Sequence, residues 1–411
     1  MPLGPVFGNG AQHFFSIFRL TASGAPVAAM RALPIRPFAA SRFLSGVVSM
    51  SIDRALVDAA LAAVTDPNTG RPFSAAKGVR NVTIDGTTVR AEVVLGYPAK
   101  TRHESLRALV EGELRKVPGV ERAEVAISQS IVAHAVQRGV KLLPNVKNIV
   151  AVASGKGGVG KSTTAVNLAL ALASEGASVG LLDADIYGPS IPTMLGIHDR
   201  PDSPDGQSMN PLEGYGVQAN SIGFLVEQDN PMVWRGPMVT SALEQLLRQT
   251  NWRELDYLIV DMPPGTGDIQ LTLAQRVPVT GAVIVTTPQD IALIDAKKGL
   301  KMFEKVGVPI LGIVENMSIH ICSNCGHAEH IFGAGGAERM AGDYGVELLG
   351  SLPLDIAIRE QADSGRPTVV AEPDGRVAET YREIARKVAI HIAERARDMT
   401  SKFPSIVVQN T

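Results

Sequence analysis

Apolar and polar positions follow regular patterns from Ser51 onward, and the first stretch predicts a small α/β domain. Helical spacing alternates with the period-two pattern of strands, and the turn Asp85-Gly86 joins two of the strands as a hairpin. The expected helices and strands are Asp53–Val64, Val79–Ile84, Val89–Leu95, Arg102–Val117 and Val120–Ile127. We therefore predict a compact accessory domain over residues 51–130, joined by a linker at 131–145 to a second domain.

A second pattern begins at Val146, where short Val/Ile/Leu runs alternate with helical stretches. Strands that are apolar throughout are typical of a parallel sheet buried on both faces. The expected strands are Ile149–Ala153, Ser178–Leu182, Tyr257–Val260, Ala282–Thr286 and Ile310–Val314, and the expected helices are Ser162–Ser174, Ile291–Val306 and Val377–Arg395. The pattern predicts a doubly wound α/β domain over residues 146–400, with a frayed tail at 401–411.

Residues 1–50 differ in composition from the rest of the chain. They contain Arg19, Arg31, Arg36 and Arg42 but no Asp, Glu or Lys. An acid-poor, Arg-containing leader can be a mitochondrial transit peptide. We favour an upstream extension before Met50, because the segment lacks a clear Arg-rich amphipathic helix. The expected compartment is then the cytoplasm, with the mitochondrial matrix as the alternative.

Charge and cysteine content narrow the function classes. The 39 basic and 41 acidic residues give a formal charge of -2, so no broad field attracts nucleic acid or anionic lipid. No apolar run approaches the roughly 18 residues that a membrane helix needs. Two cysteines in 411 residues fit a reducing compartment better than a secreted, disulfide-linked protein. We expect neither nucleic-acid nor membrane binding.

The segment Gly155–Ser162 satisfies the P-loop pattern between a predicted strand and a predicted helix. Its glycines let backbone N–H groups surround phosphate oxygens at a helix N-terminus. Lys161 is placed to reach the β and γ phosphates, and the Ser162 hydroxyl to coordinate Mg²⁺. The spacing also matches the dinucleotide fingerprint G-x-G-x-x-G, but such a site has no use for Lys161-Ser162 or for Lys156. The loop predicts a nucleoside triphosphate site.

Acidic residues follow two of the predicted strands. Asp183 and Asp185 lie two residues apart, so alternation places both side chains on one side of the strand end, toward the nucleotide crevice. One can position the attacking water and the other can support Mg²⁺, although Asp183 could instead cap the next segment. Asp261 ends the run Tyr257–Val260 in Walker B form and is expected to bind Mg²⁺ through water.

With Lys156 inside the loop, the sequence resembles the deviant Walker A ATPases, the MinD and ParA group. The resemblance implies that Lys156 reaches the nucleotide of a second copy in a homodimer, and that Asp185 positions the attacking water. It implies that Asn316 recognises adenine. The expected catalytic residues are Lys156, Lys161 and Asp185, and the expected ATP and Mg²⁺ contacts are Gly155, Lys156, Gly157, Gly158, Val159, Gly160, Lys161, Ser162, Thr163, Asp183, Asp261 and Asn316.

Cys322 and Cys325 have the C-x2-C spacing of a metal-binding knuckle. A thioredoxin-type redox pair is disfavoured because no matching βαβ context surrounds it. A zinc site within one chain is open, with additional ligands from His320, His327 or His330. An iron–sulfur cluster normally takes four thiolates, which two copies of this chain would supply.

Several motifs in order resemble the Mrp (ApbC) iron–sulfur cluster carrier ATPases. They are Asp183–Ser190, Trp234–Pro237, Asp261–Asp268, Glu315–Met317 and the pair Cys322/Cys325. The resemblance implies a slow ATPase that is a homodimer, holds a [4Fe-4S] cluster between subunits and passes it to apo-proteins, with scaffold proteins as further partners.

The accessory domain is similar to the front domain of bacterial members of that family. It lacks the cysteine that some relatives carry near Val94–Pro98, which favours target docking over cluster handling. The alternative function is a MinD/ParA-type positioning ATPase with a structural zinc knuckle. That role needs a basic surface or an amphipathic membrane helix, for which Tyr381–Arg397 is the candidate.

Overall fold

The structure is a computed structural model that describes residues 51–134, 140–226, 236–322 and 324–402. The chain divides into two units, Met1–Ser49 and Met50–Thr411. The predicted extension and the last part of the predicted tail fall outside the described residues, as do Trp234 and Arg235.

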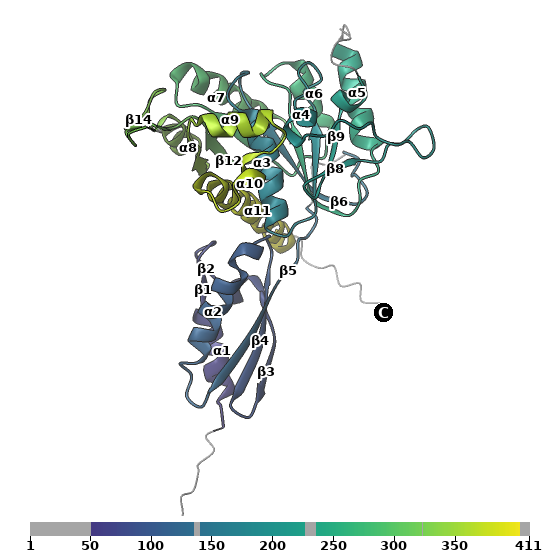
Figure 1. Cartoon of the computed structure of the whole chain (residues 1–411). Coiled ribbons are helices and arrows are strands. Elements are labelled where there is room, and N and C mark those ends of the chain that lie inside the picture. The colour runs from purple at the N-terminus through teal and green to yellow at the C-terminus, as the bar shows by residue number, and fades with distance from the viewer. Residues whose placement is uncertain (1–50, 135–139, 227–235, 323, 403–411) are drawn as a thin grey trace, which may run out of the picture. The chain divides into compact units, whose positions relative to one another are not determined.

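The small domain contains the helices and strands that the sequence predicts (Figure 1). Strands β3 and β4 form the expected antiparallel hairpin, and β5 lies parallel to β4 on its other side. Asp53 caps the first helix by accepting a hydrogen bond from the Ala55 N–H. The elements are α1 (Arg54–Ala63), β1 (Thr65–Asp66), β2 (Arg71–Pro72), η1 (Phe73–Ala76), β3 (Val79–Asp85), β4 (Thr88–Leu95), η2 (Lys100–Arg102), α2 (His103–Leu114) and β5 (Arg122–Gln129).

An eight-stranded sheet in the order β15-β12-β11-β6-β10-β7-β9-β8 forms the centre of the larger domain. All neighbouring strands are parallel except the edge pair β8 and β9. The strands are β6 (Val146–Ala153), β7 (Val179–Asp183), β8 (Leu212–Gly214), β9 (Val217–Ser221), β10 (Leu255–Asp261), β11 (Gly281–Thr286), β12 (Ile310–Glu315) and β15 (Leu348–Ser351). The doubly wound α/β fold is confirmed, and the sequence patterns missed β8, β9 and β15.

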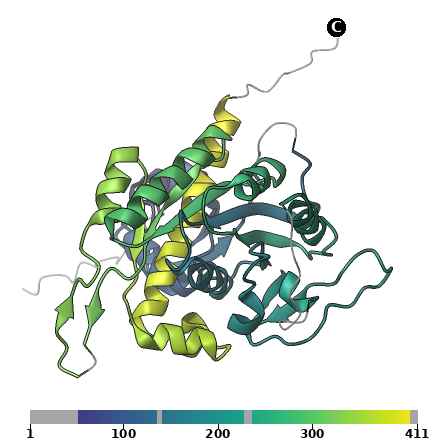
Figure 2. The ribbon, with the colours of Figure 1, turned by 90° about the horizontal axis from the view of Figure 1, so that it is seen from above.

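Helices cover both faces of this sheet, as Figure 2 shows. Val150 and Val152 of β6 pack with the apolar residues of α3 and α11, whereas Ile149 and Ala151 face the cluster that includes α5, α6 and α7. This alternation explains why the strand is apolar throughout. The helices are α3 (Lys161–Ser174), α4 (Ile191–Leu195), η3 (Ile222–Phe224), α5 (Gly236–Arg248), α6 (Asp268–Arg276), α7 (Asp290–Lys305), α8 (Gly336–Tyr344), α9 (Ile356–Asp363), α10 (Thr368–Ala371) and α11 (Arg376–Lys402).

Helix α11 uses its apolar face inside the protein. Tyr381, Ile384, Val388 and Ile392 are buried in the cluster shared with α3. The helix continues to Lys402, beyond the predicted end at Arg395, so part of the predicted tail is helical. Within the ranges that the structure describes, no helix is both long and apolar enough to cross a membrane.

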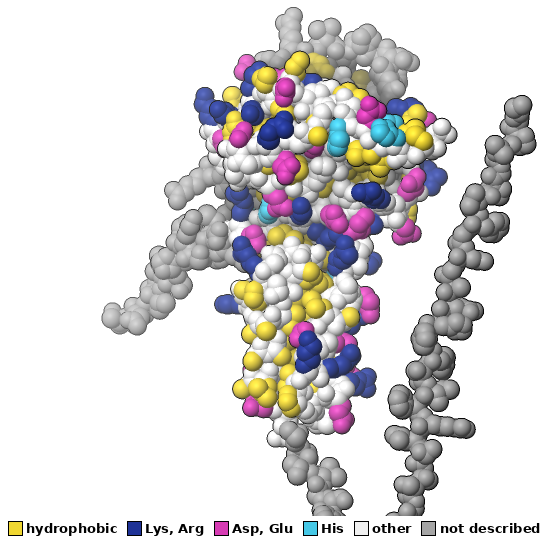
Figure 3. Space-filling model, turned by 90° about the vertical axis from the view of Figure 1, so that its left-hand side faces the viewer, with side chains coloured by type: hydrophobic (Ala, Val, Ile, Leu, Met, Phe, Trp, Pro, Cys, Tyr) yellow, Lys and Arg dark blue, Asp and Glu magenta, His cyan; other side chains and the backbone are white. Residues whose placement is uncertain are grey.

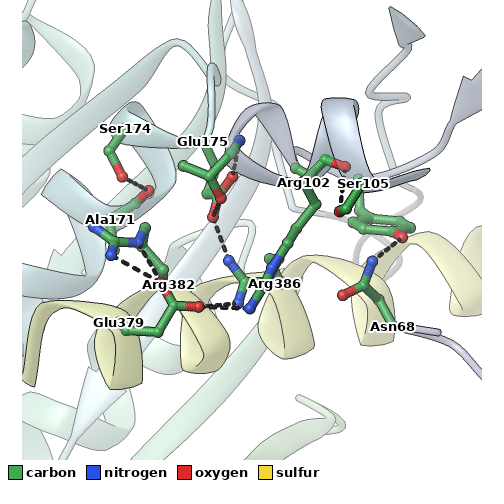
Figure 4. Close-up of polar contacts among 12 residues, drawn as sticks. Asn68, Arg102, Ser105, Ala171, Ser174, Glu175, Glu379, Arg382 and Arg386 are labelled. Carbon is green, nitrogen blue, oxygen red and sulfur yellow. Dashed lines mark hydrogen bonds and ion pairs between the residues drawn. The ribbon is translucent and has the colours of Figure 1, made fainter. Parts of the chain in front are cut away.

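Polar contacts join the small domain to the C-terminal end of α3 (Figure 4). The buried Glu175 carboxylate accepts hydrogen bonds from the Thr101 N–H at 3.0 Å and the Thr101 hydroxyl at 2.7 Å. Arg386 of α11 also pairs with Glu175. Glu379 then binds both Arg386 and Arg102, at 2.8 and 2.7 Å. Because α3 begins at Lys161, one helix extends from the phosphate loop to this junction.

Candidate nucleotide site and cysteine loop

The predicted phosphate loop connects the end of β6 to the start of α3, as its motif requires. Gly158 and Gly160 have φ values of +81° and +82°, in the left-handed region that favours glycine. Helix α3 begins at Lys161 directly after Gly160, so its free N–H groups face the loop. This is the geometry in which backbone N–H groups and a helix dipole bind a phosphate anion.

Two glycines of the loop have different surroundings. A Cβ atom on Gly155 would lie 2.1 Å from the backbone carbon of Asp295 in α7, so this glycine allows close contact between loop and helix. A Cβ atom on Gly157 would meet none of the described residues within 4 Å. The side of the loop at Gly157 is therefore open, whereas the side at Gly155 is packed against α7.

Lys161 lies among acidic side chains at the end of the sheet. It is only 6% exposed, and its Nζ atom is 2.7 Å from Asp261 Oδ1 and 3.8 Å from Asp185 Oδ2. The Ser162 hydroxyl is 3.1 Å from the same Nζ atom. The structure thus brings together four residues from three motifs, and the first and last of the four, Lys161 and Asp261, are 100 positions apart in the sequence.

The Asp261 carboxylate fits a Mg²⁺ site. It is fully buried at the end of β10, and its Oδ2 atom has no hydrogen-bond partner among the described residues. Burial raises the pKa of Asp261, and the neighbouring Lys161 opposes that shift. A buried carboxylate oxygen without a partner is costly, so this atom is available for a hard cation beside Ser162.

Asp183 has the capping role that the sequence left open. Its buried carboxylate accepts hydrogen bonds from the backbone N–H groups of Asp185, Ser190 and Ile191 and from the Ser221 hydroxyl, at 3.0–3.2 Å. Burial and the nearby Asp261 charge raise the pKa of Asp183 to about 7. Asp183 therefore fixes the segment that carries Asp185.

Asp185 comes two residues after Asp183 but contacts different groups. It lies near Lys161, and its pKa is raised by burial against the opposing effect of the Lys161 charge. Strand β7 ends at Asp183, so strict alternation does not continue to Asp185. The two carboxylates have different partners, and of the two only Asp185 lies within ion-pair distance of the loop lysine.

Lys156 is half-buried within the loop. Its backbone carbonyl accepts a hydrogen bond from the Ser154 hydroxyl at 2.9 Å, which fixes the main chain at this position. No acidic side chain in the described part of the chain pairs with its amino group. The charge of Lys156 is thus not neutralised by the residues that surround Lys161.

Asn316 contacts the phosphate loop directly. Its Nδ2 atom donates to the Val159 carbonyl at 2.9 Å, and its Oδ1 atom accepts from the Met317 N–H at 2.9 Å. A Cβ atom on Gly160 would lie 2.1 Å from Asn316 Nδ2. Both ends of the amide are engaged with protein, so the adenine contact remains a prediction.

The two cysteines lie on a short hairpin formed by β13 (His320–Ile321) and β14 (Ala328–Glu329). The Cys322 N–H donates to the His327 carbonyl at 2.9 Å, and the Gly326 N–H donates to the Cys322 carbonyl at 2.8 Å. Both thiols are free; Cys322 is half-buried and Cys325 is exposed. Backbone N–H groups of Cys325 and Asn324 lower the pKa of Cys322, which favours the thiolate that binds metal.

In the described part of the chain, the neighbouring histidines are not grouped with the cysteines as a metal site. The ring Nδ1 atoms of His320 and His330 are held by the carbonyls of Leu354 and Ser318, at 3.0 and 2.7 Å. Across the described ranges, no three His, Cys, Asp or Glu side chains are grouped to hold a metal ion. Figure 3, which views the side where β14 lies in Figure 1, shows exposed histidine and hydrophobic side chains on this face.

Glu315 belongs to the motif Glu315–Met317, but the sequence analysis gave it no role of its own. It is buried at the end of β12, and its Oε2 atom accepts from the Ala337 N–H of α8 at 2.8 Å. It thereby holds the start of α8 against the point where the cysteine-bearing segment leaves the sheet. The signal was present in the sequence, because an acidic residue ending an apolar strand is also what identified Asp261.

Comparison with known families covers most of both domains. Residues 145–389 match the family model described as NUBPL iron-transfer P-loop NTPase. Residues 54–127 match the model described as iron-sulfur cluster assembly protein.

Individual relatives agree with the family models. The chain is 55% identical over 343 residues to an iron-sulfur cluster carrier protein of Escherichia coli K12, covering 82% of this chain and 92% of the relative. It is 61% identical over 279 residues to an iron-sulfur cluster carrier protein of Pseudomonas fragi, covering 67% and 97%. A nucleotide-binding protein from Archaeoglobus fulgidus, solved with ADP, is similar at a TM-score of 0.50 and 38% identity, covering 56% of this chain and 90% of that one.

Proposed function

Because this chain belongs to the family of NUBPL iron-transfer P-loop NTPases, we propose that it is an ATP-dependent carrier of iron–sulfur clusters. One observation carries the proposal: a pair of free thiols, one exposed and one half-buried, lies in a domain that also has a complete phosphate loop. The thiols supply two ligands where a cluster usually needs four.

The nucleotide site is proposed to bind ATP with Mg²⁺. The backbone of Gly157–Gly160 and the start of α3 would hold the phosphates, and Lys161 would neutralise their charge. Ser162 and Asp261 would hold Mg²⁺, which supplies further neutralisation of the phosphate oxygens. Support comes from the open side of Gly157 and from the unpartnered Asp261 Oδ2 atom among the described residues.

Hydrolysis is proposed to need two copies of the chain. Asp185 would orient the attacking water, and Lys156 would reach the nucleotide of the second copy, as Lys156 has no acidic partner in the described part of its own chain. Turnover would be slow, because a single chain lacks the second lysine. Lys156→Ala should keep ATP affinity within about twofold and lose hydrolysis in a phosphate-release assay, whereas full activity would remove this assignment.

The cluster is proposed to be [4Fe-4S], bound between two subunits by Cys322 and Cys325 of each. It is cargo for apo-proteins, with scaffold proteins as donors. The free thiols fit a reducing compartment, and we propose the cytoplasm. The small domain, which has no cysteine, is proposed to dock targets.

The positioning-ATPase alternative has less support. Its candidate membrane helix, Tyr381–Arg397, lies within α11, whose apolar face packs in the core with α3. Its structural zinc knuckle would need further ligands from the same chain. Among the described residues, no His, Asp or Glu side chain is grouped with the two cysteines to hold a metal ion.

Anaerobic reconstitution tests the proposal. The protein is incubated with iron and sulfide, desalted, and analysed for iron, sulfide, zinc and mass in solution. We expect about four iron and four sulfide per dimer, with broad visible absorption, because each chain offers only two thiolates. The loaded protein should restore activity to an apo-enzyme that needs a [4Fe-4S] cluster.

Zinc in a ratio of one per monomer, held when iron is in excess, would contradict the carrier function and favour the zinc knuckle. A matched control is the variant Ser208→Ala, which changes an exposed loop away from the cysteine hairpin and should load normally.

A further inference from the structure

Both cysteines lie in one excursion from the central sheet, residues 316–336, between the end of β12 and the start of α8. The base of this excursion is fixed. Glu315 accepts the Leu352 N–H through its carbonyl and the Ala337 N–H through its carboxylate, both at 2.8 Å. Any displacement of the cysteine hairpin must therefore arise within the excursion itself.

The first residue of the excursion, Asn316, contacts the phosphate loop. Its Nδ2 atom donates to the Val159 carbonyl at 2.9 Å, one residue before Gly160 and two before Lys161. It also fills the space beside Gly160 where a Cβ atom would be. A change in the backbone of the loop at Val159 or Gly160 therefore acts directly on this side chain.

The other end of the same amide fixes the turn that leads to the cysteines. Asn316 Oδ1 accepts the Met317 N–H, and Met317 has a φ of +57°, a conformation that non-glycine residues rarely adopt. Ser318 follows, with its N–H bound to Leu352 and its carbonyl accepting from His330 Nδ1 at 2.7 Å. His330 lies directly after β14, so Ser318 also binds the return arm of the hairpin.

Resting on the proposed carrier function, we propose that Asn316 is a positioning residue that couples the phosphate loop to the cysteine hairpin. Nucleotide in the loop orders Val159 and Gly160, the amide of Asn316 follows, and the turn at Met317 transmits the change to Cys322. Cys322 lies six residues along the chain from Asn316, the residue that contacts the phosphate loop, and Cys325 lies nine residues from it. This role differs from adenine recognition, which would require the same amide to face the base.

Thiol alkylation of cluster-free protein tests the coupling. The rate of reaction of Cys322 and Cys325 with iodoacetamide is followed by mass spectrometry, without nucleotide and with Mg²⁺ and a saturating non-hydrolysable ATP analogue. In the unsubstituted protein we expect the analogue to slow alkylation by a factor of about three to ten, the range that one neutral hydrogen bond supports. In Asn316→Ala the factor should fall to about one.

Asn316→Asp is a second variant, because it keeps the acceptor for the Met317 N–H and places an oxygen beside the Val159 carbonyl instead of a donor. It should lose the nucleotide response while the turn is retained. The matched control, Asn81→Ala, removes an exposed asparagine that binds Glu92 in the small domain and should respond like the unsubstituted protein. Affinity for ATP and GTP analogues and mass in solution are measured on the same samples.

The coupling is overturned if the ATP analogue slows cysteine alkylation in Asn316→Ala as it does in the unsubstituted protein, or if it slows alkylation in neither. It is also overturned if Asn316→Ala loses the slowing only because the variant no longer binds nucleotide or no longer dimerises. If alkylation of Asn316→Ala is still slowed by the analogue but the variant no longer prefers ATP over GTP, Asn316 recognises adenine instead. Cluster loading of the unsubstituted protein separates the two proposals. If it loads and delivers the cluster but Asn316→Ala responds normally, only the coupling fails; if it never loads, the carrier function fails.

Discussion

The phosphate loop and the cysteine loop each follow a strand of the same sheet. They differ in how many of the groups that a ligand would need are present within one chain. Around Lys161, the described residues supply the cation, the buried acids and the helix N-terminus. Around Cys322, two thiols and several N–H groups are present, but the described residues bring no third metal ligand. The residues around Lys161 are brought together within one chain, whereas the proposed cluster site would take its remaining thiolates from a second copy.

This difference has a physical consequence for stability. Lys161 and Asp261 are buried together, so removing either one leaves an uncompensated buried charge. Cys325 is exposed and Cys322 only half-buried, so their side chains contribute little to the packed core. Substitutions at the first site should therefore affect folding and chemistry together, whereas substitutions at the second should affect cargo alone.

The largest expected effects come from two variants, each of which removes the function of one site and leaves the other site unchanged. Cys322→Ala with Cys325→Ala should lose the cluster completely, because no thiolate remains, and keep ATP affinity within about twofold. Lys161→Ala should lower ATP hydrolysis by roughly 10²–10³-fold, since the main cation for the phosphates is gone. Iron content and phosphate release are measured for both variants, with Lys147→Ala as the control for an exposed lysine pair.

The contrast between the two sites is contradicted if cluster binding and nucleotide binding cannot be lost independently of each other. Loss of ATP binding in the double cysteine variant would mean that the cysteine loop helps to form the nucleotide site. Loss of iron binding by folded Lys161→Ala would mean the converse.

A second, smaller effect separates two glycines of the phosphate loop. Gly155→Ala should lower the free energy of unfolding by roughly 1–3 kcal/mol, because its Cβ atom would lie 2.1 Å from the backbone of Asp295 in α7. Gly157→Ala, which meets no described residue within 4 Å, should change it by at most about 0.5 kcal/mol. Urea unfolding of the nucleotide-free protein measures both. Equal destabilisation would show that loop conformation, and not contact with α7, requires glycine at position 155.

The last effect concerns the pH dependence of stability and is the smallest when measured over a single pH unit. The pKa of Asp183 is about 7 in the folded protein and near 3.8 when unfolded, so between these values the folded state holds a proton that the unfolded state has released. The free energy of unfolding should therefore fall as pH rises through this window, by at most ~1.4 kcal/mol per pH unit from this group, and level off above pH 7. Asp183→Asn should flatten that slope.

Urea unfolding at several values between pH 5 and pH 8 measures the two slopes. Asp205→Asn is the control, because Asp205 is exposed and its pKa is lowered by N–H groups of its own loop. Identical slopes in the Asp183→Asn variant and the unsubstituted protein would show that Asp183 is ionised in the folded state throughout this range.

Periodicity predicted most of the fold because the buried strands of a parallel sheet are apolar along their whole length. It missed β8 and β9, where Leu212–Gly214 is partly exposed and Val217–Ser221 carries buried polar side chains such as Asn220. It missed the short edge strand β15 for a similar reason. These strands are stabilised by pairing with neighbouring strands, and a local pattern of apolar residues gives no information on that pairing.

The candidate site was predictable where chemistry requires adjacent residues, as in Gly155–Ser162 and Cys322–Cys325. The roles of Asp183 and Asp185 were harder to separate, because their different partners, backbone N–H groups for Asp183 and Lys161 for Asp185, are visible only in the folded chain. The partners of Asn316 were also hidden from the sequence. Val159 lies 157 positions away, and only the register of β12 beside β11, which itself pairs with β6, brings the two together.

The Glu175 junction limits how far the two domains are interchangeable as modules. If the small domain were absent, Glu175 would lose both hydrogen bonds from Thr101, and its pairing with Arg386 would be opened to water. Water would then screen the attraction between these two charges. At the far end of the helix that starts at the phosphate loop, the ATPase portion thus relies on the small domain for two hydrogen bonds to one carboxylate. A fusion that replaced the small domain would have to supply a new donor pair for this one carboxylate.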